Sequence, residues 1–272
     1  MSQKIKELAK VFKTISKVKY YSITFDKNAP KIFESKVGGL PYWTPDKVYP
    51  TDSKGTKLTL LAQINFDKEK VESPLPTNGM LQFFIRDDES FGLNFDNMTE
   101  QDGFKVVYHE QVDYKITKDS IENLDIPDSS KMKNSAILKE AKFTMEQKEE
   151  FINTQDYKHK EFFNLAYSQV YGKKPKKAQD FYEVLNEKET EQFEKELDVN
   201  NSWHKMLGYA FFTQEDPRYM EQYKNYDTLL LQLDSESDIL MWGDTGICNF
   251  FIPQNSLLEK DFSNVLYSWD CY

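Results

Sequence analysis

Histidine and acidic residues are the first place to look for chemistry in this 272-residue sequence. There are three histidines, His109, His159 and His204, and no HExxH or His-x-His spacing. Zinc binding or a nucleophilic triad would need such a set of partners. His204 lies shortly before Gly208 and is the best candidate for a catalytic role, although a structural or surface histidine is the commoner case.

Residues 242–246 (Trp-Gly-Asp-Thr-Gly) form the sharpest local signal for a ligand site. The two glycines would let the backbone approach a ligand closely, Trp242 offers a flat apolar wall, and Asp244 can accept hydrogen bonds or bind a cation. The same pattern also fits a tight turn, in which Asp244 makes an Asx-turn and Trp242 packs on the core. We keep both interpretations and favour the turn.

Motifs for cofactor and metal chemistry are missing from the sequence. It has no P-loop, no GxGxxG, no GxSxG and no protein-kinase set, which argues against a nucleotide-dependent enzyme. Residues 234–238 alternate carboxylates like the start of a calcium loop, but the sixth and twelfth positions are Ile239 and Thr245, not glycine and glutamate. We therefore expect an acidic hairpin turn there, no cofactor and no bound metal.

Charge and composition restrict the partners. The chain carries 35 Lys+Arg against 45 Asp+Glu, a net charge of −10, so its surface repels nucleic acid unless a basic patch is segregated. The best such patch, residues 173–177, lacks interleaved aromatics and is interpreted as a solvated loop. No apolar run approaches the roughly 18 residues of a membrane span, and the first residues lack a signal-peptide core. With two cysteines, Cys248 and Cys271, and no CxxC motif, we expect a cytoplasmic protein that binds neither nucleic acid nor membrane.

Apolar periodicity predicts the elements that must position these residues. Helical spacing covers residues 4–16, 162–171 and 181–197. Thr144 followed by Gln147 fits a capping box, so we expect a mainly helical segment over about 135–200. Strand patterns cover residues 20–25, 58–66, 80–85, 104–108, 229–233, 239–242 and 247–252. Sheet regions on both sides of a helical segment predict an α+β fold. The lysine-bearing helix at 4–16 could lie on a membrane, but docking on the protein's own core is the commoner arrangement.

Internal similarity is the most informative feature. Three blocks recur in the same order: Gly39 and Gly208, residues 60–65 and 229–234 (both 169 apart, 208 − 39 and 229 − 60), and residues 79–85 and 246–252 (167 apart, 246 − 79). We interpret the chain as one domain, residues 1–272, built from two similar antiparallel β units that pack together. The units would span about residues 20–110 and 203–272.

Each predicted unit has one glutamine within an apolar strand, Gln63 or Gln232. A buried amide without partners costs about 1–3 kcal/mol, so each must be hydrogen-bonded. The structural interpretation is that each amide holds a neighbouring loop. The functional interpretation is that both amides face a shared cleft. Trp43 would then lie at the end of the first unit that corresponds to the position of Trp242 in the second. No catalytic residue is assigned, and the candidate ligand-binding cleft comprises Trp43, Gln63, His204, Gln232, Trp242 and Asp244.

Several short blocks, taken in order, carry a resemblance to a known family: residues 38–41, 60–64, 81–84, 207–209, 230–234, 242–246 and 269–271. Together they resemble the YwqG-like family of bacterial proteins, over roughly residue 33 to the end. The resemblance implies a duplicated α+β fold and a cytoplasmic bacterial protein, with no established catalytic residues to carry over. Some relatives lie in toxin-associated gene neighbourhoods, which adds an immunity-type role as an alternative.

The leading hypothesis is a non-catalytic binding protein that holds a small molecule or a polypeptide at the junction of two β units. One alternative is a hydrolase-like enzyme with a site near Asp244 and His204. Another is an immunity-type protein that neutralises a toxin partner through an acidic face.

Overall fold

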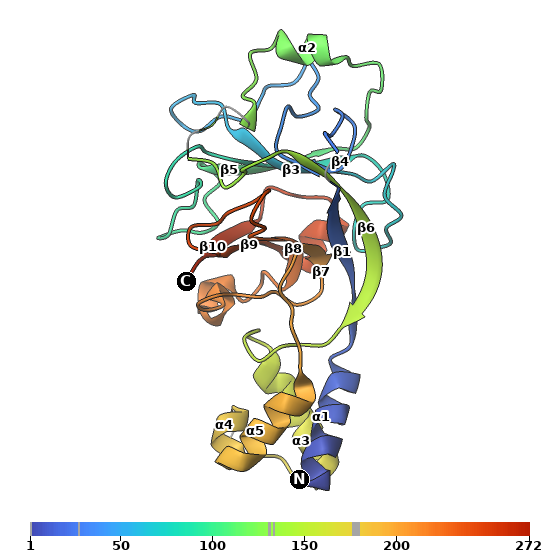
Figure 1. Cartoon of the computed structure of the whole chain (residues 1–272), viewed down its shortest axis with the longest axis vertical. Coiled ribbons are helices and arrows are strands. Elements are labelled where there is room, and N and C mark those ends of the chain that lie inside the picture. Colours follow the sequence, from blue (N-terminus) through green and yellow to red (C-terminus); the bar gives the residue numbers. More distant parts are fainter. Residues whose placement is uncertain (1, 27, 130–131, 133, 176–179) are drawn as a thin grey trace.

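A single antiparallel sheet and a separate group of helices make up the protein (Figure 1). The computed structural model describes residues 2–26, 28–129, 132, 134–175 and 180–272. The strands are β1 (Val18–Asp26), β2 (Lys36–Val37), β3 (Thr59–Asn65), β4 (Met80–Ile85), β5 (Phe104–His109), β6 (Ala141–Glu150), β7 (Lys205–Leu207), β8 (Thr228–Asp234), β9 (Ile247–Ile252) and β10 (Leu266–Asp270). The α-helices in the described part are α1 (Gln3–Ile15), α2 (Lys118–Glu122), α3 (His159–Tyr171), α4 (Phe181–Val184), α5 (Glu187–Leu197) and α6 (Gln254–Leu258).

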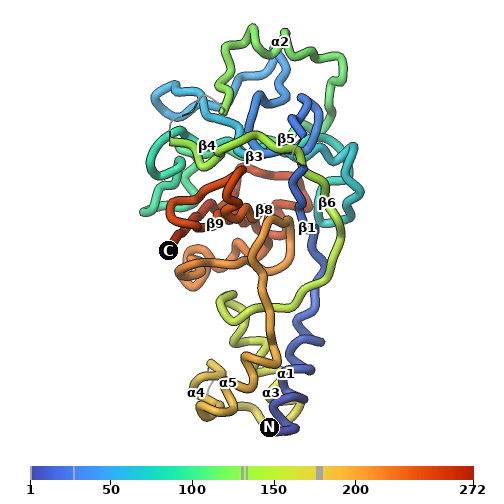
Figure 2. The backbone as a smooth tube through the Cα atoms, in the orientation of Figure 1, coloured from blue at the N-terminus to red at the C-terminus, as the bar shows by residue number. Residues whose placement is uncertain are grey.

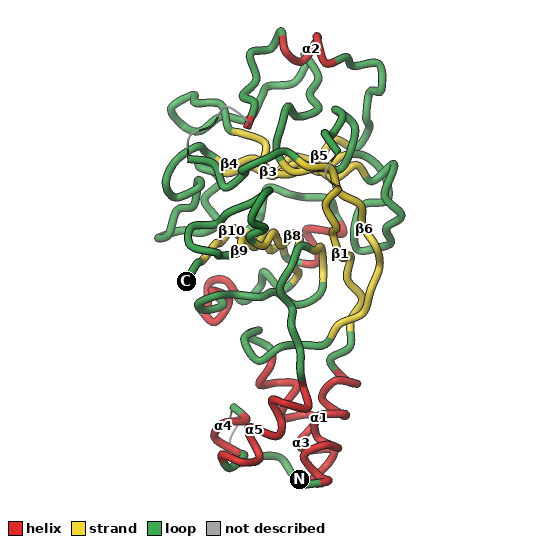
Figure 3. The backbone as a smooth tube through the Cα atoms, viewed as in Figure 1, coloured by secondary structure: helices red, strands yellow, loops and turns green. Residues whose placement is uncertain are grey.

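The ten strands follow the order β10-β9-β8-β7-β1-β6-β2-β3-β4-β5. The long strands β1 and β6 pair along their length in the middle, from Val18 opposite Glu150 to Asp26 opposite Lys142. On either side of them lie a first arm, β2 to β5, and a second arm, β7 to β10. The sheet bends so that the two arms face each other and it nearly closes (Figures 1 and 3). The expected mixture of helices and antiparallel strands is confirmed, although the strands form one continuous sheet.

Aromatic side chains fill the space between the two arms. The rings of Phe83 in β4 and Phe250 in β9 lie 4.9 Å apart, and those of Phe104 in β5 and Tyr267 in β10 lie 5.2 Å apart. All four side chains are buried in the largest apolar cluster of the molecule. Burial of such rings is the main favourable contribution to holding the arms together.

The β3–β4 pair of the first arm and the β8–β9 pair of the second arm have the same irregularity. In the β3–β4 pair the register shifts by one residue after Leu60, and in the β8–β9 pair it shifts after Leu229. A shift of this kind is a β-bulge, which bends a strand and increases its twist. Leu60 and Leu229 are themselves 169 residues apart (229 − 60), so both hairpins bend at corresponding positions.

The prediction of a helix starting at Thr144 is wrong. Residues 141–150 form strand β6, in which Thr144 lies opposite Thr24 and Gln147 opposite Tyr21 of β1. Pairing along the full length of β1 outweighs a local capping pattern, because each ladder position satisfies backbone groups that a short exposed helix would leave to water. The segment between the arms is therefore part strand and part helix.

The strand predicted over residues 239–242 is also absent. Leu240 makes only isolated bridges, to Ile137 and Glu236, and the buried Trp242 starts a turn in which Gly246 N–H donates to the Trp242 carbonyl at 2.8 Å. A run of four apolar residues signals burial, but it does not distinguish a strand from a buried turn. Strands β2, β6, β7 and β10 were not predicted.

The helices α1, α3, α4 and α5 form a cluster at one end of the molecule, with its own apolar core (Figure 2). In α1 the buried residues are Ile5, Leu8, Ala9 and Phe12, on one face, and they contact α3 and α5. The predicted docking of this helix on the protein's own core is confirmed. Helix α3 ends where predicted, with Gly172 in the left-handed conformation at φ 66°.

Candidate functional site

The two glutamines within the strands hold neighbouring loops. The Gln63 carbonyl accepts from the Tyr42 N–H at 3.0 Å, and its amide donates to the carbonyls of Ile32 and Glu34. The structural interpretation of this glutamine is therefore confirmed.

Gln232 makes the same bonds in the second arm. Its carbonyl accepts from the Phe211 N–H at 2.8 Å, and its amide donates to the carbonyls of Asn201 and Trp203. Each of these partners lies 169 residues after its counterpart in the first arm (211 − 42, 201 − 32 and 203 − 34). Both amides bind backbone groups, and neither is left with an unused carbonyl or amino group.

His204 is buried and already engaged. Its Nε2–H donates to a carboxylate oxygen of Glu236 at 3.0 Å, while Nδ1 accepts from the Asp234 N–H at 3.1 Å. Burial lowers the pKa of His204, and the neighbouring Glu236 opposes that shift. Asp244, the expected partner of a hydrolase-like pair, is exposed, and its backbone carbonyl accepts from the Tyr272 N–H. The ring of His204 is thus held by the acidic hairpin and not by Asp244.

The two tryptophans lie in different apolar clusters. Trp43 packs edge-on against Phe84 and Tyr49, and its Nε1–H donates to the Lys47 carbonyl at 3.0 Å. Trp242 belongs to the core between the arms, and its indole is packed edge-on against Phe91. None of the six predicted site residues lines the five pockets considered, which include the one beside β2 and the one along α1.

A different feature of the first arm has the geometry of a binding site. A pocket of about 450 Å³ opens beside β2, where the chain enters and leaves that strand. Its lining residues are Pro30, Lys31, Ile32, Phe33, Lys36, Leu40, Lys118, Asp128 and Glu140. The loop before β2 supplies the apolar wall, the turn after it supplies Leu40, and the segments around α2 and before β6 supply the remaining charged groups.

Lys36 is the central group of this pocket. It lies in β2, where its side chain is only 2% exposed, and its ammonium donates to the Leu40 carbonyl at 2.6 Å. Burial lowers the pKa of Lys36 to about 8, whereas the carboxylates of Glu140, Asp128 and Glu34 partly oppose that shift. An ammonium has three donors, and the described residues supply a hydrogen-bond acceptor for one of them. The other two donors have no acceptor among the described residues.

Lys205 is the counterpart of Lys36 in the second arm, and its ammonium is paired with a carboxylate. It lies in β7, 169 residues after Lys36 (205 − 36), and it faces Gln232 as Lys36 faces Gln63. Its buried ammonium donates to both carboxylate oxygens of Glu150, at 2.8 and 3.1 Å. Sequence reasoning missed both lysines, although their shared spacing with Gly39 and Gly208 was a usable signal.

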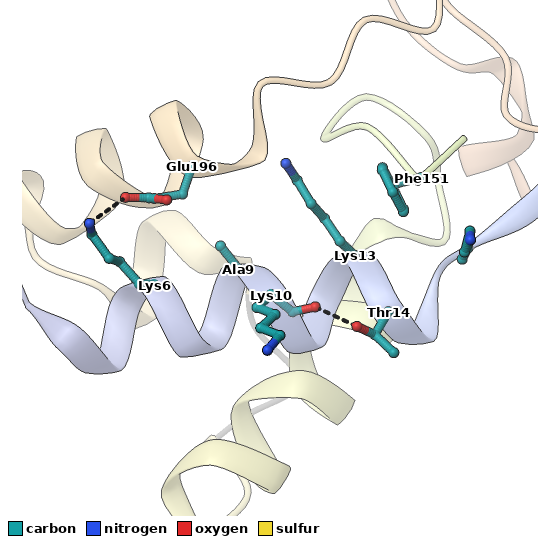
Figure 4. Close-up of a pocket in the computed structure, with 8 residues that line it drawn as sticks. Lys6, Ala9, Lys10, Lys13, Thr14, Phe151 and Glu196 are labelled. Atoms are coloured by element: carbon teal, nitrogen blue, oxygen red, sulfur yellow. Dashed lines mark hydrogen bonds and ion pairs between the residues drawn. The ribbon is translucent and has the colours of Figure 1, made fainter. Parts of the chain in front are cut away.

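A second group of lysines lies along the exposed face of α1 (Figure 4). The groove there has a volume of about 470 Å³ and is shallow. Lys6 forms an ion pair with Glu196 at 3.8 Å, and the Lys13 ammonium lies 5.7 Å from the centre of the Phe151 ring. These are surface groups with partners of their own, so we assign no site to this groove.

Several further features of the sequence can be located in the structure. Of the basic patch at residues 173–177, positions 176 and 177 lie outside the described residues. Across the described ranges, no group of three or more His, Cys, Asp or Glu side chains is arranged to hold a metal ion. Both cysteines are free thiols, and Cys248 is fully buried. A helix with the length and apolarity needed to cross a bilayer does not occur in the described chain.

Fold and site together define a mixed α/β protein with one ten-stranded antiparallel sheet and a lysine-centred pocket beside strand β2. Residues 35–271 match a protein family described as a domain of unknown function, DUF1963. The match covers most of the sequence, so the chain belongs to this family. No curated protein matches the chain.

Proposed function

We propose that this protein is a non-catalytic binding protein whose ligand is a small anionic molecule held in the pocket at Lys36. The observation that carries the proposal is a buried lysine that lines a pocket and whose ammonium has one acceptor, the Leu40 carbonyl, among the described residues. A buried charge that is only partly hydrogen-bonded is costly, so an incoming carboxylate or phosphate would supply acceptors that the Leu40 carbonyl alone does not. Charge-assisted hydrogen bonds of this kind are short and about twice as strong as neutral ones.

The pocket also restricts the ligand's size and shape. A volume of about 450 Å³ lies in the range of small-molecule sites. Ile32, Phe33 and Leu40 form an apolar wall, whereas Lys31 and Lys118 are exposed around the pocket. The exposed lysines would attract anions despite the net charge of −10. The ligand we propose has a single anionic group attached to a short apolar part.

We infer further that the two arms arose by duplication of one unit. Two findings support this: the equal bulges in β3 and β8, and the glutamine contacts that repeat at an offset of 169. A third is the second amide of each arm, since Gln82 donates to the Tyr42 carbonyl and Asn249 donates to the Phe211 carbonyl. On this inference, the pocket is a place where the two copies diverged.

The family name, the cellular location and the excluded partners are also proposals. We propose a YwqG-like bacterial protein that works in the cytoplasm and binds neither nucleic acid nor membrane; the ordered sequence blocks and the acidic composition support this. Among the described residues, no contact or pocket favours the hydrolase-like or the immunity-type alternative. His204 is occupied by Glu236, and the exposed acidic residues match no particular partner.

Anion binding at Lys36 can be tested by following backbone amide resonances during titration with butyrate and with inorganic phosphate. We expect butyrate to shift the resonances of residues 31–40 and of Glu140. Lys36→Met should weaken that binding by at least about tenfold, since a hydrogen bond to a charged group contributes roughly 1.5–3 kcal/mol. The matched control, Lys10→Met on the exposed face of α1, should bind as the wild type does. Saturable shifts elsewhere, or none in residues 31–40, would refute the proposal.

A further inference from the structure

We propose that Lys36 is a nucleophilic amine that forms a reversible imine with a small 2-oxo acid bound in its pocket. This inference rests on the proposed function, because the oxo acid's carboxylate is the anion that the pocket attracts. The inference specifies the ligand further: the ligand carries a ketone carbonyl next to its carboxylate.

The position of the Lys36 side chain is the first part of the argument. Lys36 is only 2% exposed, yet it is one of the residues that line the pocket of about 450 Å³. The ammonium is not in ion-pair contact with a carboxylate among the described residues; its acceptor is the neutral carbonyl of Leu40, at 2.6 Å. An amine in this setting loses its proton more easily than one in water, and only the neutral amine attacks carbonyl carbon.

The surrounding charges adjust this reactivity in both directions. Lys118 favours the neutral form of Lys36, whereas Glu34, Asp128 and Glu140 favour the charged form, and burial outweighs them, leaving the pKa at about 8. At neutral pH roughly a tenth of the molecules would therefore carry the free amine, a far larger share than for an ordinary lysine. Desolvation, and a second cation nearby, are the usual ways of activating a lysine for imine formation.

Lys205 provides an internal comparison. It occupies the same strand position in the second arm, but both carboxylate oxygens of Glu150 hold its ammonium, and it lines none of the described pockets. Both lysines are buried, but Lys205 is paired with a carboxylate whereas Lys36 lines a pocket. This difference makes Lys36 the site at which a carbonyl compound would react.

The reaction needs no oxidant or reductant. The neutral amine nitrogen of Lys36 attacks the carbonyl carbon, a C–N bond forms, and the oxygen takes up a proton to give a carbinolamine. Loss of the hydroxyl as water, with departure of the remaining N–H proton, gives the imine, so that amine plus ketone yields imine plus water. Glu140 lines the pocket, and its carboxylate can take and return the proton. The carboxylate of the oxo acid would lie toward Lys31 and Lys118.

Reductive trapping tests the inference directly. The full-length protein is incubated with 2-oxobutanoate, treated with sodium borohydride, and digested for peptide mass mapping. We expect a single stable adduct on Lys36, with none on Lys205 and much slower labelling of exposed lysines such as Lys10. The initial trapping rate should rise between about pH 6 and pH 9, as the Lys36 ammonium titrates. Labelling of the urea-unfolded protein should lose this selectivity.

Two further measurements keep the inference falsifiable. Lys36→Met should abolish the adduct. Urea unfolding of this variant, without butyrate, reports whether it is folded. If the variant does not fold, the mapping of the adduct on the wild-type protein still tests the inference. Labelling of Lys36 no faster than that of Lys10 would overturn the imine. If butyrate still binds in that case, the proposed anion site survives; if butyrate fails to bind as well, both ideas fall.

Discussion

Buried polar side chains in this protein are mostly structural, and their partners show why. Gln63 and Gln232 each tie two backbone segments to a central strand, and Lys205 pairs with Glu150 between β7 and β6. The amides of both glutamines are hydrogen-bonded and the Lys205 ammonium is paired with a carboxylate, which is the normal condition for buried polar groups. Lys36 departs from that rule, which is why the proposed function and the imine both centre on it.

His109 is a buried residue whose charge state links pH to stability. Its Nε2–H donates to the Gln82 carbonyl at 2.8 Å, and Nδ1 accepts from the Lys47 ammonium at 3.0 Å, so the neutral ring is the form that fits. Burial, and then the charge of Lys47, lower the pKa of His109 to about 4. In an unfolded chain a histidine titrates near 6.5.

We expect the protein to lose stability as the pH falls from about 6.5 towards 4. In that window the unfolded chain binds a proton at His109 and the folded chain does not. Protonation therefore stabilises the unfolded state, and the free energy of unfolding decreases as the pH falls. The contribution approaches about 1.4 kcal/mol per pH unit for one group. Urea unfolding at several pH values should show a smaller decrease for His109→Gln than for the wild type. Equal decreases would contradict the assignment.

At the scale of elements, local pattern and tertiary pairing compete. The helix patterns at residues 4–16 and 162–171 persist in the structure because each has a full apolar face to bury. The pattern at Thr144 is too short and too polar to do the same, and β1 offers it a complete ladder of backbone partners. The pairing therefore determines the conformation of β6.

The helical cluster should lose stability independently of the sheet. Phe12 of α1 is buried, and its ring lies 5.6 Å from that of Phe193 of α5. Phe12→Ala removes this contact and should cost about 3–5 kcal/mol. Because the cluster has a core separate from that of the sheet, hydrogen exchange should accelerate in α1, α3 and α5 much more than in β3, β4, β8 and β9. The exposed Lys10→Ala serves as control, and an equal acceleration in the strands would show that the two parts are not separable.

At the scale of the whole molecule, the arms share one core. Phe83 and Phe250 pack across the space between them, so neither arm can expose its inner face without exposing that of the other. The junction of the arms is therefore a filled core, and the pocket lies elsewhere, beside β2.

Both arms should therefore unfold in one transition. Fluorine-labelled tryptophan gives separate NMR signals for Trp43, which packs on the first arm, and for Trp242 and Trp269 near the second. Phe83→Ala should shift the urea midpoints of all three signals together, at a cost of about 3–5 kcal/mol. Leu258→Ala, at an exposed position, should leave them unchanged. A lower midpoint for Trp43 alone would mean that the arms unfold independently.

Much of this fold could be predicted from local pattern. Residues 80–85 and 247–252 alternate or run apolar with β-branched and aromatic side chains, and both strands have the predicted bounds. The need for partners at Gln63 and Gln232 also followed from residue type alone, since buried amides must be hydrogen-bonded.

The candidate site could not be predicted from the sequence. A lysine is exposed in most proteins, so the burial of Lys36 could not be predicted from its residue type. Its environment is assembled from the turn at Leu40, the α2 region and the start of β6, which lie far apart along the chain and meet only when β2 pairs with both β3 and β6. Local periodicity determined most of the strands and helices, because each depends on its own residues; tertiary pairing decided β6, the partner of His204 and the pocket, because each depends on contacts between distant segments.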